Sequence, residues 1–417
     1  MNKKLLAVAI AGVLAAPLAQ AQTANVTLYG RLNLDAEIII NAKQDAVPTL
    51  GGAASGTKEN LYRVSTNSSR FGIRGTESLG GGLNAIFQVE SSITPDNAGG
   101  QLATRETFVG LQGGWGTFKV GYFLSPYDDI QSMFGSVPTL QTGILGSQGL
   151  WSNTGWVGNT TQGGSFDDRV ANSLRYDSPN ISGFTGSLQI GGRDVGGTDG
   201  GDLSQLRRHA YVLSTGGQYN NGPISAGIVY EVHNSLREGT AANPKLQDQA
   251  FTVAGAYNFG VIKVGAAYEQ VKYDIPTNTA GAMQDLKRNF WAISGTGNLG
   301  PGQYYLAYFK ANGGTGSATC TTTAGITSCP RVGAVTQGPD SGAQQWEVSY
   351  TYPLSKRTLL YTGYTMIDNQ KNGAYNFGVN QIQGVCTGNL RNAAGNNVGC
   401  GDAARPQGLV MGMVHFF

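Results

Sequence analysis

Apolar and polar residues alternate with a period of two along most of the chain. In residues 26–35 one set of alternating positions is apolar or small, and the other carries Thr27, Tyr29, Arg31, Asn33 and Asp35. Runs of the same kind occur at 71–75, 83–90, 184–189, 251–257, 261–268, 290–294, 304–309, 346–352 and 359–365. Successive side chains of a β-strand point to opposite faces of a sheet, so this pattern predicts strands with one apolar and one polar face. Beyond residue 21 no helical period extends over twelve residues, and this part is predicted to be all-β.

The connections between these runs alternate between short and long. Short turns rich in Gly, Pro and Asn occur at 78–82, 113–116, 178–180, 220–223, 258–260, 298–302 and 353–356. Long polar segments lie near 37–59, 92–102, 124–168, 194–205, 234–247, 274–286, 312–343 and 368–407. Short turns at one rim and long loops at the other are typical of a bacterial outer-membrane barrel. The pattern therefore predicts a transmembrane antiparallel β-barrel of about sixteen strands, each long enough to cross a bilayer.

The composition excludes several other classes of protein. The 417 residues include 63 Gly and only 13% charged residues, which is roughly twice the Gly and about half the charge of a soluble domain. Low charge with 19 Tyr and 15 Phe argues against disorder, and Gly without a three-residue period excludes collagen. The longest apolar run, residues 5–19, is shorter than the roughly 18 residues of a membrane-spanning helix.

The first residues are typical of an export signal. A basic start is followed by an apolar stretch, and Ala19-Gln20-Ala21 matches the rule for signal-peptide cleavage. We therefore expect a cleaved signal peptide at 1–21 and a pore domain at 22–417. Without Lys3 and Lys4 the basic count falls from 28 to 26 and equals the 26 acidic residues, so nucleic-acid binding is not expected.

Four cysteines near the C-terminus also fit an exported protein. Cys320 and Cys329 enclose eight residues, Cys386 and Cys400 enclose thirteen, and both pairs lie in Gly-, Thr- and Asn-rich segments. Proximity predicts two local disulfides, which form in oxidising compartments. The alternative, a zinc site, lacks a nearby His and a C-x-x-C motif. No metal or other cofactor is expected.

Three segments and the C-terminal residues resemble a known family. The segments are Val26–Arg31 (VTLYGR), Ser69–Glu77 (SRFGIRGTE) followed by Leu79–Leu83, and Arg105–Leu111 (RETFVGL) followed by Gly114–Phe118. They resemble general porins of Gram-negative bacteria, and the ending His415-x-Phe417 is most similar to the neisserial and betaproteobacterial branch.

This resemblance implies an outer-membrane homotrimer of sixteen-stranded barrels, with a third loop, about 124–168, folded into the lumen. It also implies contact with outer-membrane lipid and lipopolysaccharide, and a terminal Phe417 that serves as the signal for the barrel-assembly machinery. For the trimer contact we expect Gly30, Gly72 and Gly110 to face outward and allow close approach of subunits.

Strand alternation and the resemblance together identify candidate pore residues. Alternation points six basic side chains into the lumen: Arg31, Arg70, Arg74, Lys119, Arg169 and Arg175. The porin pattern implies a basic ladder across from the third loop: Arg31, Arg70, Arg105 and Arg169. Arg105 shares its parity with the outward Val109 and Leu111, so its inward direction requires a bulge or a narrowing lumen.

The third loop carries little acid to oppose these basic residues. Asp128 and Asp129 open the loop, no further acid follows until Asp167, and the acidic Pro-Glu-Phe-Gly-like motif of related porins is absent. A positive constriction favours anions, so we expect passive diffusion of small hydrophilic solutes and ions with a weak preference for anions. The alternative is that acids at the mouth cancel the basic residues: Glu37, Glu90, Asp167 and Asp168.

Two other functions would use parts of this sequence. The first is a surface adhesin or antigen whose long loops, 312–343 and 368–407, are the functional part. The second is an outer-membrane enzyme, but His209 and His233 are grouped with no plausible nucleophile, and an enzyme is not expected. The segment Gly295–Gly300 matches a dinucleotide fingerprint, but a strand rather than a helix follows it.

Overall fold

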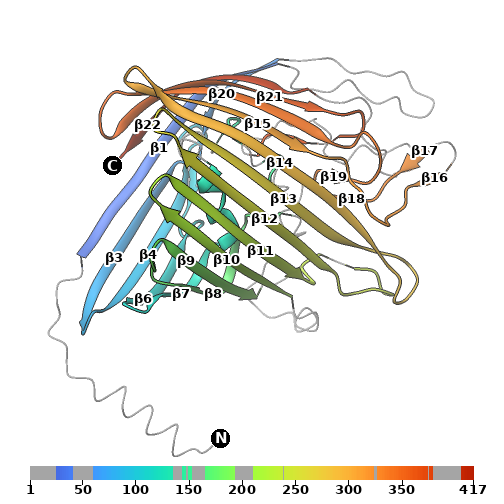
Figure 1. Cartoon of the computed structure of the whole chain (residues 1–417), viewed down its shortest axis with the longest axis horizontal. Coiled ribbons are helices and arrows are strands. Elements are labelled where there is room, and N and C mark those ends of the chain that lie inside the picture. The colour runs from blue at the N-terminus through green and yellow to red at the C-terminus, as the bar shows by residue number, and fades with distance from the viewer. Residues whose placement is uncertain are drawn as a thin grey trace, which may run out of the picture.

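The computed structural model describes residues 25–40, 60–134, 143–146, 149–152, 165–192, 210–237, 239–323, 326–373, 375–378 and 405–417. The predicted signal peptide and the pair Cys386 and Cys400 lie outside these residues. The long strands form a closed antiparallel barrel (Figure 1), which confirms the predicted fold class. No helix within the described ranges is long and apolar enough to cross a membrane.

The elements follow one another in simple up-and-down order. The strands are β1 (Asn25–Ile40), β2 (Leu61–Thr66), β3 (Arg70–Gly80), β4 (Leu83–Thr94), β5 (Gly99–Gln101), β6 (Thr107–Gly113), β7 (Gly116–Leu124), β8 (Arg169–Asp177), β9 (Phe184–Gly192), β10 (Tyr211–Asn221), β11 (Ile224–Asn234), β12 (Gln247–Asn258), β13 (Ile262–Pro276), β14 (Met283–Leu299), β15 (Gly302–Ala311), β16 (Thr321–Thr323), β17 (Ile326–Ser328), β18 (Arg331–Val332), β19 (Val335–Thr336), β20 (Ala343–Pro353), β21 (Thr358–Asn369) and β22 (Gln407–Phe416). The loop after β7 carries the helix α2 (Pro126–Asp129) and the 3-10 helix η1 (Gln131–Phe134).

The barrel wall has sixteen strands, as the turns and loops predicted. Two of them are broken. β1 pairs with both β2 and β3, so these are two parts of one wall strand, and β4 pairs in the same way with β5 and β6. β22 pairs with β1 and closes the sheet. Closure pairs the backbone amides of the wall without leaving an edge, as a β-structure in lipid requires.

The alternation in β1 shows why the wall is apolar outside and polar inside. Val26 and Leu28 are 60% and 58% exposed on the outer surface, whereas Arg31 and Asp35 are each only 4% exposed. A strand in a barrel wall places alternate side chains on the lipid face and on the lumen face. Arg31 therefore lies on the lumen face of β1.

The first and last strands meet at the C-terminal residue. The backbone nitrogen of Phe417 donates to the Gly30 carbonyl, and the Gly30 nitrogen donates to the Phe417 carbonyl, both at 3.1 Å. A Cβ built on Gly30 would lie 2.5 Å from the Phe417 ring, so this ring packs directly over the glycine backbone. Gly30 therefore accommodates the terminal aromatic ring at the closing seam.

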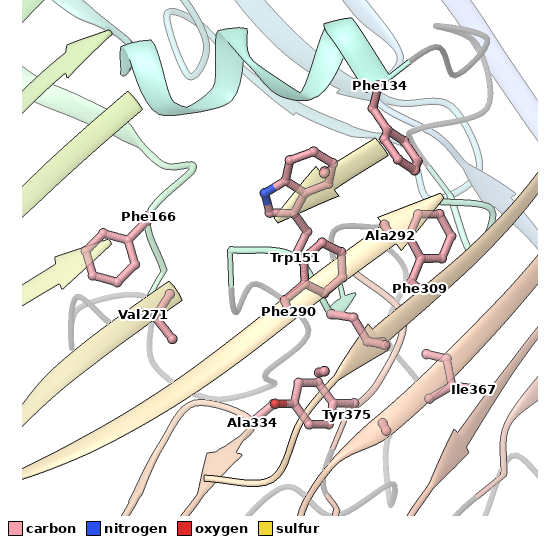
Figure 2. Packing of buried hydrophobic residues seen from close by; sticks show 14 of the residues in the cluster. Phe134, Trp151, Phe166, Val271, Phe290, Ala292, Phe309, Ala334, Ile367 and Tyr375 are labelled. Atoms are coloured by element: carbon pink, nitrogen blue, oxygen red, sulfur yellow. The ribbon is translucent and has the colours of Figure 1, made fainter. Parts of the chain in front are cut away.

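The apolar core lies inside the barrel, between the third loop and one part of the inner wall (Figure 2). From the loop, Phe134 packs edge-on against Trp151 with ring centroids 5.5 Å apart. Trp151 in turn lies 5.4 Å from Phe290 of β14, and Phe134 lies 5.8 Å from Phe309 of β15. The third loop thus folds into the lumen and is held there by an aromatic cluster.

Wall glycines make room for this loop. A Cβ on Gly265 of β13 would lie 1.8 Å from the carbonyl oxygen of Phe134, and one on Gly408 of β22 would lie 2.1 Å from Ile144. At Gly265 the contact is with the loop backbone, which leaves no space for a side chain on the wall. At Gly408 the Ile144 side chain fills the space that a wall side chain would occupy.

Two of the three glycines expected at a subunit contact face the lumen instead. A Cβ on Gly72 would meet the ring of Tyr29, which lies on the lumen side with its hydroxyl bonded to Glu90. Gly110 pairs with Lys119 and shares its inward face, since the neighbouring Val109 is 63% exposed on the outside. The expectation for these two glycines is wrong, because each occupies the same parity as an inward basic residue.

Candidate functional site: the pore constriction

Three arginines and one glutamate form the centre of the basic wall. Arg31 of β1 pairs directly with Arg70 of β3 in the strand register. Glu90 of β4 accepts from Arg105 at 2.5 Å and lies 3.5 Å from Arg70, while its other oxygen accepts from Tyr29 at 3.0 Å. One carboxylate therefore faces three guanidinium groups that lie close enough to repel one another, and the cluster keeps an excess of positive charge.

Breaks in two wall strands shape this cluster. The segment between β2 and β3 contains Ser68 with φ 53°, and Arg31 donates to the Ser68 carbonyl at 3.2 Å. Arg105 lies in the second break, between β5 and β6, where its backbone nitrogen donates to the Glu90 carbonyl at 3.0 Å. Bulges of this kind re-aim side chains next to functional sites. Arg105 faces inward because it precedes the regular part of β6, and this resolves its conflicting parity.

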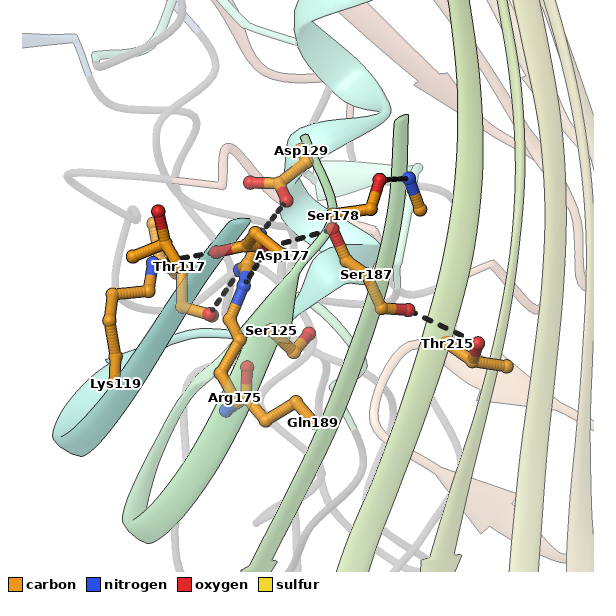
Figure 3. Close-up of polar contacts among 12 residues, drawn as sticks. Thr117, Lys119, Ser125, Asp129, Arg175, Asp177, Ser178, Ser187, Gln189 and Thr215 are labelled. Atoms are coloured by element: carbon orange, nitrogen blue, oxygen red, sulfur yellow. Dashed lines mark hydrogen bonds and ion pairs between the residues drawn. The ribbon is translucent and has the colours of Figure 1, made fainter. Parts of the chain in front are cut away.

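Lys119 and Arg175 belong to a separate, charge-balanced network (Figure 3). Asp177 accepts from Arg175 at 2.8 Å and lies 3.1 Å from the Lys119 amine. Arg175 also forms an ion pair with Asp129 and donates to the Leu124 carbonyl at 3.1 Å. Two basic groups and two acidic groups thus hold the start of the third loop, so this network fixes the loop and adds little net charge to the pore.

Arg74 and Arg169 lie near members of the central cluster. The Arg74 guanidinium lies 5.0 Å from the centre of the Tyr29 ring, and the residue is exposed to solvent. Arg169, at the start of β8, is attracted to Asp128 and Glu106 and repelled by Arg105. Both arginines therefore add basic groups to this part of the wall.

Asp128 carries little negative charge at neutral pH. Burial, reinforced by the nearby carboxylates of Asp167 and Asp129, raises the pKa of Asp128 to about 8. Burial also raises the pKa of Asp167, although Ser165 donates to its carboxylate at 2.7 Å and Gln131 at 3.3 Å. A buried carboxyl without a full ionic partner favours its neutral form. The acids of the loop therefore offset the arginine charges only in part.

A buried ion pair anchors the third loop on the opposite wall. Glu269 of β13 and Arg288 of β14 form a salt bridge, and both side chains are fully buried. Glu269 accepts from the Tyr127 hydroxyl at 2.5 Å and from the Ser152 backbone nitrogen at 2.9 Å. Arg288 donates to the carbonyl of Leu150. Two loop segments that are far apart in the sequence are thereby tied to one pair of wall residues.

Strand alternation alone does not reveal this anchor. Glu269 and Arg288 occupy inward positions of β13 and β14. Strand alternation therefore places both charged side chains on the lumen face. Their role depends on where the loop lies, and strand alternation carries no information about a loop. The same holds for Ser294, whose hydroxyl donates to the Phe134 carbonyl at 2.5 Å.

The remaining candidates occupy other parts of the molecule. Cys320 and Cys329 are joined by a disulfide in the loop after β15. His233 lies 2.8 Å from Glu231 and stacks on Phe166 at 4.4 Å, which places it in the packing under the third loop. His209 lies outside the described residues. In the part of the chain that the structure covers, no group of three or more His, Cys, Asp or Glu residues is arranged to hold a metal ion.

A closed sixteen-stranded barrel with an apolar outer wall, a charged lumen and an inserted loop defines a diffusion channel of the Gram-negative outer membrane. The chain belongs to the Gram-negative porin family, whose sequence profile matches residues 6–372. The protein is therefore an outer-membrane porin, as the sequence motifs indicated.

Relatives in both expected groups support this assignment. Outer membrane porin protein 32 of Delftia acidovorans is 29% identical over 415 residues, which cover 94% of this chain and 95% of the relative. Major outer membrane protein P.IB of Neisseria sicca is 28% identical over 340 residues, covering 75% of this chain and 84% of the relative. The resemblance to this branch of porins is confirmed.

Solved structures share the fold. The anion-selective porin from Comamonas acidovorans superposes with a TM-score of 0.67 at 22% identity, covering 94% of this chain and all of that one. OmpT of Vibrio cholerae, in its trimer form, has a TM-score of 0.60 at 13% identity and covers 95% of this chain and all of that one. At these identities the likeness concerns the fold alone.

Proposed function

We propose that this porin lets small hydrophilic solutes and inorganic ions diffuse passively with a weak preference for anions. The observation that carries the proposal is the sharing of one carboxylate, Glu90, by Arg70 and Arg105 beside a third arginine, Arg31. A positive constriction lowers the entry barrier for anions and raises it for cations. The anion-selective porin from Comamonas acidovorans, with the same fold, adds support.

Three of the four acids expected at the mouth compensate this charge only in part. Glu37 forms an ion pair with Arg63 of β2, and so it neutralises a different basic residue. Asp167 has a raised pKa, and Glu90 is one carboxylate among several guanidinium groups. The balance leaves the basic wall positive, but the partial compensation predicts a weak preference rather than strict selection.

The test is the reversal potential of the purified protein in a planar bilayer across a tenfold KCl gradient. We expect open conductance steps whose reversal potential favours Cl⁻, and a smaller preference in Arg70→Ala. Lys272→Ala is the matched control, because it removes one positive charge from the outer face of β13. Its neighbour Val271 is fully buried on the lumen side, so Lys272 points away from the lumen. A wild-type channel that favours K⁺ would contradict the selectivity and leave the porin assignment intact.

We further propose that the mature chain begins near Gln22 after removal of residues 1–21, that the loop at about 124–168 is the constriction loop, and that the porin assembles as a homotrimer. The trimer form of OmpT supports the last proposal. Conductance steps in groups of three, together with a mass by light scattering that equals three chains, are the expected results.

A further inference from the structure

Four buried oxygen atoms on β20 have no hydrogen-bond partner among the described residues. They are Oε1 of Gln345, both carboxylate oxygens of Glu347 and Oγ of Ser349. The three residues occupy successive inward positions of the strand, and their exposed fractions are 0%, 1% and 3%. Buried polar atoms are nearly always hydrogen-bonded, so four exceptions side by side on one strand require an explanation.

Glu347 is buried without a cationic partner. Its neighbours in the strand register are Ala307 of β15 and Thr365 of β21, which carry no charge. Within the described ranges, no basic side chain forms an ion pair with its carboxylate. Burial of an ionised carboxylate is costly unless the group is paired or coordinates a cation. An ionised Glu347 therefore requires a positive charge that the described residues do not supply.

The third loop closes over this carboxylate. Nε2 of Gln345 donates to the Gly146 carbonyl at 2.9 Å and to Oγ1 of Thr365 at 3.0 Å, which uses the amide hydrogens and leaves Oε1 as an acceptor. The Gly146 backbone and the Ser349 hydroxyl lie beside the Glu347 carboxylate, but neither completes a hydrogen bond of normal geometry with it. The unpartnered oxygens therefore gather between β20 and the Gly146 segment of the loop.

The chemistry of these atoms suits a small metal cation of single charge. Carboxylate, amide and hydroxyl oxygens are ligands that hard cations prefer. Glu347 supplies one negative charge, and the oxygens of Gln345 and Ser349 are neutral. A monovalent cation makes this buried group of atoms electrically neutral, whereas a divalent cation would leave a positive charge buried and unbalanced.

We propose that a monovalent metal cation such as Na⁺ binds between Glu347, Gln345 and Ser349 and holds the third loop against β20. The Glu347 carboxylate balances the charge of the cation, and Oε1 of Gln345 and Oγ of Ser349 are its neutral ligands. Gly146 covers the site from the loop side. The cation is thus a second anchor of the loop, in addition to the buried ion pair of β13 and β14. The site does not depend on the proposed anion preference, because the arginine cluster takes no part in it.

Thermal unfolding of the purified porin in a neutral detergent, followed by circular dichroism, tests this site. NaCl is compared with choline chloride at equal concentration and pH, because choline is too large for a buried site of this kind. We expect a higher unfolding temperature in NaCl, which rises with the NaCl concentration, since a ligand that binds only the folded state stabilises it by mass action. Glu347→Gln keeps the size of the side chain, removes its charge and should abolish the difference between the two salts.

Two further variants serve as controls. Glu37→Gln removes another buried inward acid, one that is paired with Arg63, and should keep the Na⁺ dependence of the wild type. Ser349→Ala keeps the carboxylate and should raise the Na⁺ concentration of half-maximal stabilisation by at least about tenfold, as loss of a supporting polar group does at other metal sites. Conductance steps in bilayers show that each variant folds.

The other outcomes overturn the proposal. An equal effect of Na⁺ on the wild type and on Glu347→Gln assigns the cation to a different site. The absence of a Na⁺ effect in the wild type removes the cation altogether, and a stability that then rises as the pH falls shows that Glu347 carries a proton instead. A larger effect of Ca²⁺ than of Na⁺ that Glu347→Gln abolishes assigns the site to a divalent ion and contradicts the argument from charge balance.

Discussion

Arg31 and Arg70 lie directly opposite each other on the lumen faces of β1 and β3. Like charges at opposed positions of a sheet destabilise the pair. The wall tolerates them because Glu90 lies 3.5 Å from Arg70, and because Arg31 donates to the backbone carbonyls of Asn67 and Ser68 at the break in the neighbouring strand. This part of the lumen wall thus keeps two repelling charges that a purely structural wall would not need.

The variant Glu90→Gln should strengthen the preference for anions. The change removes the carboxylate that Arg70 and Arg105 share, and it leaves an amide of nearly the same size. In bilayers the reversal potential in a KCl gradient should shift further toward Cl⁻. The variant should also unfold at a lower temperature, since the guanidinium groups lose their common partner. Glu37→Gln is the control, because it also removes an acid from this wall. Glu37 pairs with Arg63, which lies outside the cluster, so the reversal potential should shift less than in Glu90→Gln. An unchanged reversal potential in Glu90→Gln would show that the cluster does not set selectivity.

Selectivity should depend on pH through Asp128. The pKa of Asp128 is raised to about 8, so the carboxyl is mostly neutral at pH 7 and becomes negative as the pH rises to 9. The added negative charge near Arg169 lowers the preference for anions, and the decline should be centred near pH 8. Measuring reversal potentials from pH 6 to 9 checks the sign. Asp128→Asn should remove the decline in this range; a decline that persists in the variant assigns it to another group.

The variant Gly265→Ala should displace the third loop. The added methyl group would lie 1.8 Å from the Phe134 carbonyl oxygen, so the loop must move away from β13. We expect an altered single-channel conductance and faster proteolysis within the loop, while the barrel itself remains folded. Gly217→Ala in β10 is the matched control, because a Cβ there meets no atom within 4 Å. Identical conductance in both variants would show that the loop yields without consequence.

Breaking the buried anchor should destabilise the protein strongly. In Glu269→Gln the Arg288 guanidinium remains buried without its ionic partner, which typically costs about 3–5 kcal/mol. The temperature at which the barrel unfolds, seen as a mobility shift in detergent gels, should fall. Lys287→Ala removes the partly exposed pair with Asp285 and should cost at most about 1 kcal/mol. Equal effects of the two substitutions would contradict the anchoring role.

The wall of the barrel was predictable because its physics is periodic. Alternation within regular strands placed Arg31 and Arg70 in the lumen, and turn composition gave the number of wall strands. The expectation for Gly72 and Gly110 rested on their small size rather than on their position in the strand. Alternation groups each with an inward residue, and both glycines face the lumen.

The loop contacts were beyond the reach of the sequence pattern. Arg105 lies in a strand break, where side-chain direction depends on the local backbone rather than on parity. Glu269 and Arg288 acquire their role only when Tyr127, Leu150 and Ser152 reach them from a distant segment. Such contacts depend on how the loop folds in three dimensions, so a single sequence does not reveal them.

The glycines beneath the third loop allow the permeability of the channel to change independently of the stability of its barrel. Gly265 and Gly408 are two points at which the wall makes room for the loop, at Phe134 and at Ile144. Substitutions in the loop that leave these two contacts intact can therefore alter which solutes pass while the barrel keeps its stability. Permeability can thus evolve, or be engineered, without redesigning the membrane-embedded part of the protein.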